Sequence, residues 1–230
     1  VDGVISTAVA TGDAVTNMKQ KELGVAVATI GGATTSLVVF EGGQPIYSVA
    51  IPIGSDHITN DLALGLRIPI ETAERIKIDH GSAVAKAVPR KDFIEVNLGD
   101  STESVSRYYA AQIIEARTAE ILEHIDLSLN EIGRRGALPA GILFSGGGGK
   151  LSGLTDLARR VLCLPAALGY PIDTTSVTFQ TNDLAFAPVI GIVRFAARLE
   201  MDDSGGTHHP IARLSGLRDG LRKVGQWLLP

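Results

Sequence analysis

Cysteine, tryptophan and methionine are scarce in this sequence, whose 230 residues include one Cys, one Trp and two Met. The single cysteine, Cys163, cannot form a disulfide within the chain, which is typical of proteins in a reducing compartment. The sequence also lacks an uninterrupted apolar run of about 20 residues, the length that a membrane-spanning helix needs. No signal peptide is recognised at its start. We therefore expect a cytosolic protein without a membrane-spanning helix.

An excess of basic residues is missing as well. The 21 Lys and Arg are outnumbered by 25 Asp and Glu, and the formal net charge is −4. No nucleic-acid partner is therefore expected.

The five histidines and the one cysteine are not spaced as metal ligands. No Ser-His-Asp or paired-carboxylate pattern marks a catalytic centre. Hydrophobic residues make up 45% of the chain, enough to build a core.

Glycine, by contrast, is abundant, with 26 residues, and it is concentrated in two turns. The first turn comprises residues 31–35, Gly-Gly-Ala-Thr-Thr, and the second comprises residues 145–149, Ser-Gly-Gly-Gly-Gly. A glycine turn after a strand lets backbone N–H groups approach an anion without a Cβ in the way. Taken alone, the first turn is better explained by a plain hairpin and the second by a tight strand-to-helix connection.

β-Branched runs predict strands, and apolar residues at intervals of three and four predict helices. The first three strand-like runs predict an antiparallel meander, and the whole order predicts an α/β fold. Strands are expected at 25–30, 37–40, 46–53 and 140–144. Ser55 is expected to cap a helix, and further helices are expected from Pro69 to Gly81 and over about 102–132, 151–162 and 188–199. The inward stripe of the long helix is predicted to be Ile114, Thr118, Ile121, Ile125, Leu129 and Ile132.

Glu74 and Lys77 lie between the two glycine turns and share one face of a predicted helix. An isolated Glu-Lys pair of this kind is usually a solvated surface ion pair worth less than ~1 kcal/mol. Its position between two candidate phosphate-binding turns favours a role in binding a nucleotide.

Several further motifs occur in a fixed order along the chain. They are Ile30-Gly31-Gly32-Ala33-Thr34-Thr35, Ile51-Pro52-Ile53-Gly54 with Thr59-Asn60-Asp61, Ala73-Glu74-Arg75-Ile76-Lys77, Ile113-Ile114-Glu115-Ala116-Arg117 and Ser145-Gly146-Gly147-Gly148 with Leu151, Gly153 and Leu154. With these motifs, the chain from about Leu23 to its end resembles the C-terminal half of the FtsA family. These are bacterial cell-division proteins of the actin-like ATPase superfamily. The glycine turns occur throughout that superfamily, whereas the middle motifs and the basic tail point to this family.

The resemblance implies an actin-like (ribonuclease H-like) ATPase lobe of α/β class with an inserted smaller α/β subdomain. Residues 1–23 would end a first lobe, and residues 24–200 would form the second lobe. The inserted subdomain would span about 54–136. Residues 201–210 would be a linker, and residues 211–230 would be an amphipathic membrane-targeting helix.

ATP is the cofactor that the resemblance implies, held between two lobes. Gly31, Gly32, Thr34 and Thr35 would face the β- and γ-phosphates, Glu74 and Lys77 the ribose and adenine, and Gly146, Gly147 and Gly148 the adenine and ribose. Thr29, Ala33 and Ser36 depart from the superfamily pattern, because an aspartate is usual at the first and third positions. A hydroxyl is a much poorer Mg²⁺ partner than a carboxylate. The departure therefore argues against Mg²⁺ and for weak or absent hydrolysis.

Three partners are implied in the same way. Arg117 would bind the acidic C-terminal peptide of FtsZ, the chain would self-associate into filaments, and its tail would bind an anionic membrane. The protein would then lie on the cytoplasmic face of the cell membrane at the division site. The predicted membrane-facing residues are Leu214, Leu217, Arg218, Leu221, Arg222, Lys223, Val224, Trp227 and Leu228.

The tail pattern supports a surface helix, because an apolar stripe repeats at intervals of three, four, three and four, formed by Leu214, Leu217, Leu221, Val224 and Leu228. Arg213, Arg218, Arg222 and Lys223 outnumber the single acid Asp219, so residues 211–230 carry a charge of +3. A terminal helix packed on its own domain is the alternative. At the level of function, the alternatives are a pilus-assembly adaptor or a stand-alone ATPase or kinase of the same superfamily.

Overall fold

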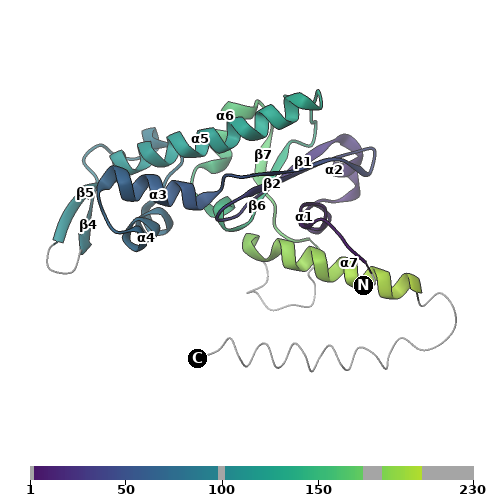
Figure 1. Ribbon diagram of the computed structural model, residues 1–230. Helices are drawn as coiled ribbons and strands as arrows, with labels where there is room; N and C mark the ends of the chain where they lie inside the picture. Colours follow the sequence, from purple (N-terminus) through teal and green to yellow (C-terminus); the bar gives the residue numbers. More distant parts are fainter. Residues whose placement is uncertain (1–2, 98–101, 173–182, 204–230) are drawn as a thin grey trace, which may run out of the picture. The chain divides into compact units, whose positions relative to one another are not determined.

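A computed structural model of the chain describes residues 3–97, 102–172 and 183–203 (Figure 1). The chain divides into two compact units, one formed by Ile5–Ile192 and the other by Val1–Val4 with Val193–Pro230. Helix α7 (Ala187–Asp203) begins in the first unit and continues into the second. The predicted amphipathic helix, residues 211–230, lies outside the described residues, as do residues 204–210 of the predicted linker.

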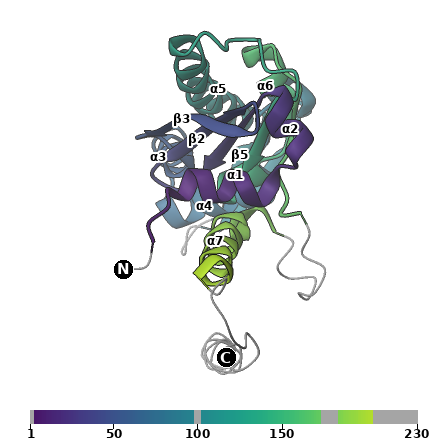
Figure 2. The same ribbon diagram turned by 90° about the vertical axis from the view of Figure 1, so that its right-hand side faces the viewer.

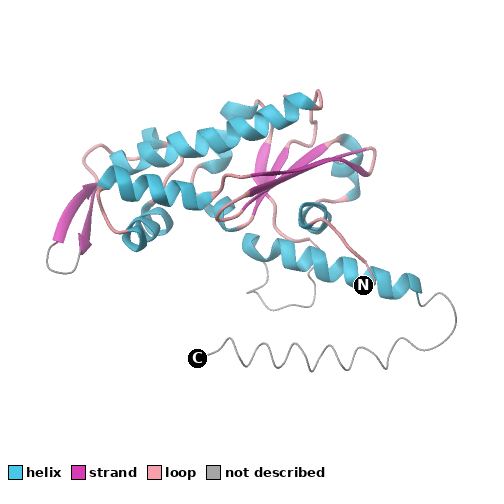
Figure 3. Cartoon of the chain, viewed as in Figure 1, coloured by secondary structure: helices cyan, strands magenta, loops and turns pink. Residues whose placement is uncertain are grey.

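The described part of the first unit contains a mixed sheet of five strands, drawn in magenta in Figure 3. Its strand order is β3-β2-β1-β6-β7, and the strands are β1 (Val25–Ile30), β2 (Thr35–Glu41), β3 (Gln44–Ile51), β6 (Ile142–Ser145) and β7 (Ala166–Leu168). The predicted meander is confirmed, because β1 pairs antiparallel with β2 and β2 with β3. β6 adds to β1 in parallel, and β7 adds to β6 in parallel.

Helices cover both faces of this sheet (Figure 2). The helices that contact the sheet include α1 (Thr7–Val15), α2 (Met18–Leu23), α5 (Arg107–Glu131) and α6 (Leu154–Leu162). Helices α3 (Ser55–Leu66) and α4 (Ile70–His80) pack against each other, and α3 packs against α5. Strand β1 shows why both faces are covered, since successive side chains point to opposite sides. Ala26 and Ala28 join the core that includes residues of α3 to α6. Val25 and Val27 join a second core with residues of α1.

The long helix begins later than the sequence predicts. Residues Thr102–Ser106 form strand β5, which pairs antiparallel with β4 (Phe93–Asn97) in a separate two-stranded sheet. Helix α5 begins at Arg107, and the hydroxyl of Ser106 accepts a hydrogen bond from the Tyr109 N–H as its cap. The predicted inward stripe of this helix is confirmed for five of its residues, which are all buried: Ile114, Thr118, Ile121, Ile125 and Leu129.

Candidate functional site

The two glycine turns leave the sheet from neighbouring parallel strands. Thr29 of β1 pairs with Ser145 of β6, and each glycine turn begins within two residues of that pair. Gly146 has a φ of +81°, and a Cβ built on it would lie 2.5 Å from the carbonyl oxygen of Ile30. Only glycine allows the second turn to approach the end of β1 this closely. Ligands of open α/β sheets bind at the carboxyl ends of parallel strands, where both turns lie.

The second turn is bonded to the segment that precedes α7. The Gly146 N–H and the Ser145 hydroxyl both donate to the carbonyl oxygen of Leu184, each at 3.0 Å. Lys150 pairs with Asp183 at 2.6 Å, and its hydrogen bond helps to hold the pKa of that carboxyl below its usual value. Apart from its neighbours in the chain, no described residue lies within 4 Å of the position that a Cβ on Gly147 would take, so this exposed glycine borders open space there.

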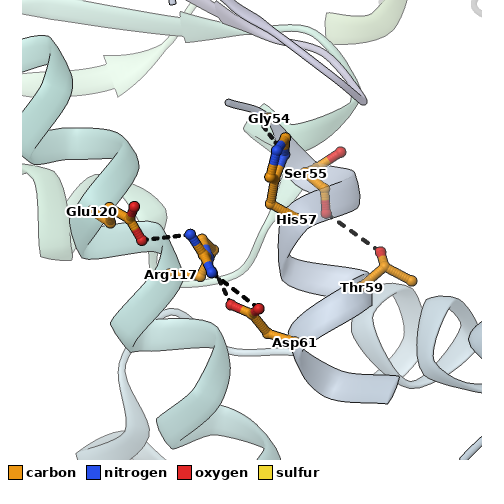
Figure 4. Close-up of polar contacts among 7 residues, drawn as sticks. All are labelled: Gly54, Ser55, His57, Thr59, Asp61, Arg117 and Glu120. Carbon is orange, nitrogen blue, oxygen red and sulfur yellow. Dashed lines mark hydrogen bonds and ion pairs between the residues drawn. The ribbon is translucent and has the colours of Figure 1, made fainter. Parts of the chain in front are cut away.

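The first turn is joined to the start of α3. The N–H groups of Ser55 and Asp56 donate to the carbonyl oxygens of Gly31 and Gly32, both at 2.9 Å. A Cβ on Gly54 would collide with these same oxygens. Gly54, rather than the predicted Ser55, therefore caps this helix, and its N–H donates to Nδ1 of His57 at 3.2 Å (Figure 4).

The two threonines of the first turn differ in exposure. Thr35 is fully buried, and its hydroxyl donates to the carbonyl oxygen of Ile53 at 2.8 Å. Thr34 is exposed, and its carbonyl oxygen closes the turn by accepting the Gly31 N–H at 2.9 Å. Of the two predicted phosphate-facing threonines, Thr34 is therefore the one whose side chain is accessible.

Glu74 and Lys77 form a hydrogen-bonded cluster between α4 and α3. Their side chains pair at 2.7 Å, and the Lys77 side chain is only 10% exposed. The hydroxyl of Thr59 accepts from Lys77 at 2.8 Å and donates to Glu74. Sequence reasoning assigned Thr59 no role at the site, although it lies one helical turn after Ser55. This pair is more than a solvated surface contact.

Burial works against ionisation of Glu74, but the hydrogen bonds from Lys77 and Thr59 and the charge of Lys77 outweigh it. The pKa of Glu74 therefore lies below its usual value. Lys77 also donates to the carbonyl oxygen of Ser55 at 3.2 Å. Since Ser55 in turn donates to Gly31, the pair on α4 is connected to the first glycine turn through the start of α3.

The segment that follows α4 contacts the segment after the second turn. The Ala83 N–H donates to the carbonyl oxygen of Ser152 at 2.8 Å. Together with the Gly146–Ile30 contact, this bond completes a ring of contacts through β1, the first turn, α3, α4 and the second turn. The segments of this ring contain the predicted residues Gly31, Gly32, Thr34, Thr35, Glu74, Lys77, Gly146, Gly147 and Gly148, whose role in binding a nucleotide stays a prediction.

The polar groups beside the first glycine turn are a buried hydroxyl and one carboxylate. The Thr29 hydroxyl is buried without a hydrogen-bond partner. Among residues 3–97, 102–172 and 183–203, no group of three His, Cys, Asp or Glu could hold a metal ion. Asp56 is the acidic group beside the turn, with its Oδ2 atom 2.7 Å from where a Cβ on Gly32 would lie. In nucleotide sites Mg²⁺ is bound through one or two carboxylates together with phosphate oxygens and waters, and Asp56 is the carboxylate that this turn offers.

Arg117 does not join either glycine turn. Its guanidinium binds Asp61 of α3 through two hydrogen bonds, of 2.6 and 3.0 Å, and Glu120 at 2.6 Å (Figure 4). The hydrogen bonds with Asp61 are the main reason why the pKa of Arg117 is raised.

The predicted membrane-facing residues lie outside the described chain. Within the described ranges, none of the helices has the length and apolar character to cross a bilayer.

Comparison with known proteins identifies the family. The family described as "Cell division protein FtsA" matches residues 26–191. A cell-division protein FtsA from Agrobacterium fabrum is 34% identical over 99% of this chain and 53% of its own length. The corresponding protein from Pseudomonas aeruginosa is 32% identical over 88% of this chain and 49% of its own length. The chain therefore spans about half the length of these curated relatives.

Solved structures agree on the fold. MreB5 of Spiroplasma citri bound to ADP superposes with a TM-score of 0.68 and 17% identity, over 88% of this chain and 62% of that protein. The PilM-PilN type IV pilus biogenesis complex gives a TM-score of 0.57 and 20% identity, over 79% of this chain and 47% of that one. The expected actin-like α/β fold is confirmed, and the chain belongs to the FtsA family of cell-division proteins.

Proposed function

We propose that this chain forms one side of an ATP-binding site in an FtsA-like cell-division protein. The observation that carries the proposal is the adjacency of the two glycine turns at the carboxyl ends of β1 and β6. Backbone N–H groups in such turns bind phosphate oxygens. The similar MreB5 structure is bound to ADP, which supports a nucleotide as the ligand.

Each part of the ring has a separate task in this proposal. Gly31, Gly32 and Thr34 face the phosphates, and Gly147 leaves room for the adenosine. Glu74 and Lys77 are held by Thr59 so that their remaining polar surface faces the ribose. Bound Mg²⁺ would neutralise phosphate charge, but Thr29 offers it a hydroxyl, a poorer ligand than the carboxylate that is usual at this position in the superfamily. We therefore expect this chain alone to bind ATP weakly and to hydrolyse it negligibly.

We further propose that the chain acts as an adaptor at the division site rather than as a stand-alone enzyme. It would self-associate, bind the C-terminal peptide of FtsZ near Arg117, and attach to the cytoplasmic face of the cell membrane through residues 211–230. Family membership supports this proposal, as do the apolar stripe and the charge of +3 on the tail. We retain the domain boundaries above, with a lobe over 24–200 and an inserted subdomain over about 54–136.

Titration of the whole chain with a fluorescent ATP analogue tests nucleotide binding. Lys77→Ala is expected to weaken binding by about tenfold, because it removes a partly buried cation of the ring. Lys86→Ala is the matched control, since Lys86 is an exposed lysine elsewhere in the same unit. Equal affinities for the two variants would contradict the assignment of Lys77.

Co-sedimentation with anionic liposomes tests the membrane role separately. The wild-type chain should sediment, whereas Leu221→Glu/Trp227→Glu should remain in the supernatant, because each change places a charge on the apolar stripe. Sedimentation of both proteins to the same extent would rule out this tail as the membrane anchor.

A further inference from the structure

Strand β3 forms an edge of the five-stranded sheet. It pairs with β2 on one side, and no hydrogen bond of the described residues reaches the outer side of its Gln44–Ala50 segment. The strand is eight residues long, and its sequence, Gln-Pro-Ile-Tyr-Ser-Val-Ala-Ile, carries no charge. An edge of this kind offers a row of backbone donors and acceptors to another strand.

The other described edges are protected in ways that β3 is not. Strand β7 at the opposite edge is only three residues long. In the two-stranded sheet, β4 carries Glu95 and β5 carries Glu103. Short length and charge are the usual means of blocking strand addition. On β3 such features are confined to the start of the strand, where Pro45 lies and where the pairing with β2 has an irregularity at Ile46, and Tyr47–Ala50 has none.

The side chains of β3 divide between its two faces. Tyr47 and Val49 pack against the core that contains α5, and the Tyr47 hydroxyl bonds to Glu131 of that helix at 3.1 Å. Ile46, Ser48 and Ala50 are exposed, and Ile46 retains 47% of its surface. A further strand would therefore extend both the sheet and its apolar faces.

We infer that β3 pairs antiparallel with β3 of a second copy of this chain. The inference rests on the self-association proposed above and assigns it a surface. A second copy suits this edge because an uncharged strand can face itself without opposing like charges. A two-fold axis normal to the sheet gives the same patch on both partners, as closed homodimers require.

Symmetry and the strand sequence fix the register of this pairing. Directly opposed residues of an antiparallel pair share a face, so the pair must be centred on a residue rather than between two. Pro45 has no N–H, and the Ile51 carbonyl already accepts from the Ile53 N–H at 2.8 Å. The available segment, 46–50, is therefore centred on Ser48. Ser48 then faces its own copy, and Tyr47 faces Val49 of the partner subunit.

Sedimentation equilibrium of the whole chain over a concentration series tests the inference. Ser48→Lys should weaken dimerisation by about tenfold or more, because it opposes two positive charges across the axis. Ser104→Lys is the matched control, an exposed serine on a strand that already carries an acid, and it should behave like wild type. Circular dichroism establishes that each variant is folded.

Cross-linking provides a second measurement of the same contact. In a Cys163→Ser background, Ser48→Cys should form a disulfide-linked dimer on mild oxidation, and Ser104→Cys should not. A wild-type chain that stays monomeric at every concentration would overturn both this inference and the proposed self-association. Self-association that is insensitive to Ser48→Lys, or equal cross-linking at positions 48 and 104, would overturn the β3 contact alone.

Discussion

Thr29 of β1 lies directly opposite Ser145 of β6 in the parallel ladder. Because the two strands end together, the glycine turns that follow them emerge at one edge of the sheet, although more than a hundred residues separate them in the sequence. Neither turn alone distinguishes a phosphate-binding loop from an ordinary connection. Their common edge, with the Glu74–Lys77 pair joined to it through α3, makes the nucleotide interpretation specific.

The close approach of the second turn to β1 predicts a large effect of Gly146→Ala on stability. The substitution would strain a φ of +81° and place a Cβ 2.5 Å from the Ile30 carbonyl oxygen. Gly42→Ala is the matched control, because Gly42 has a φ of +58° but open space around it. Urea denaturation should show a loss of about 1–2 kcal/mol for Gly42→Ala and a clearly larger loss for Gly146→Ala. Similar losses would mean that the contact with β1 is readily relieved.

Removal of the Thr59 hydroxyl should destabilise the protein. Thr59 is 4% exposed, and Thr59→Val takes away both the acceptor for Lys77 and the donor to Glu74. The free energy of unfolding should fall by about 1–3 kcal/mol. Thr102→Val, at an exposed strand position, should change it by less than about 0.5 kcal/mol. Equal effects would show that the hydroxyl does not hold the cluster together.

The lowered pKa of Glu74 predicts a pH-dependent contribution to stability. As the pH falls, the unfolded chain protonates this carboxyl near its ordinary value of 4.5, before the folded chain does. The stability from ionised Glu74 is therefore complete above that value and is lost as the pH falls through the lower folded pKa. The difference in unfolding free energy between wild type and Glu74→Gln should be constant from pH 7 to about pH 5 and shrink below about pH 4.5. A difference that does not change in this window would contradict the assigned pairing.

The ion pair between Arg117 and Asp61 allows a sharp test of the predicted FtsZ-peptide contact. If the guanidinium also binds the peptide, Asp61→Asn should release it and tighten peptide binding by roughly twofold to tenfold. Arg117→Lys should weaken binding, because lysine cannot reproduce the two-pronged geometry. Fluorescence anisotropy with a labelled acidic peptide measures both, with Arg159→Lys as the control. Unchanged affinity in Asp61→Asn and Arg117→Lys would show that Arg117 joins α3 to α5 and does not bind the peptide.

The sequence predicts those parts of the fold that local patterns determine. The β-branched runs of the meander and the apolar stripe of α5 need no distant information, and both are confirmed. Thr102–Ser106 was wrongly placed in the long helix, because this polar segment is a strand only through its pairing with Phe93–Asn97. Ser55 was wrongly chosen as a helix cap for a similar reason. The residue that must be small there is Gly54, which contacts carbonyls of a turn more than twenty residues earlier.

In the candidate site too, some features are visible in the local sequence and others depend on contacts between distant segments. Its glycines and the Glu74–Lys77 spacing are visible in the sequence, whereas their connection through Thr59 and Ser55 depends on how α3 and α4 pack. The engagement of Arg117 with Asp61 likewise joins two helices that no local pattern pairs. Sequence reasoning therefore identified which residue types gather at the site but not the contacts that hold them.

The affinity of the whole chain for ATP, compared between wild type and Gly147→Val, tests the central claim most directly. No other described residue beyond its neighbours in the chain lies within 4 Å of the position of a Cβ on Gly147. The substitution should therefore leave the melting temperature unchanged while its side chain enters the space assigned to the adenosine. Ala137→Val, at an exposed loop position, controls for added bulk. The account predicts that Gly147→Val weakens ATP binding by about tenfold or more and that Ala137→Val has no effect. ATP affinity that is the same in all three proteins would contradict it.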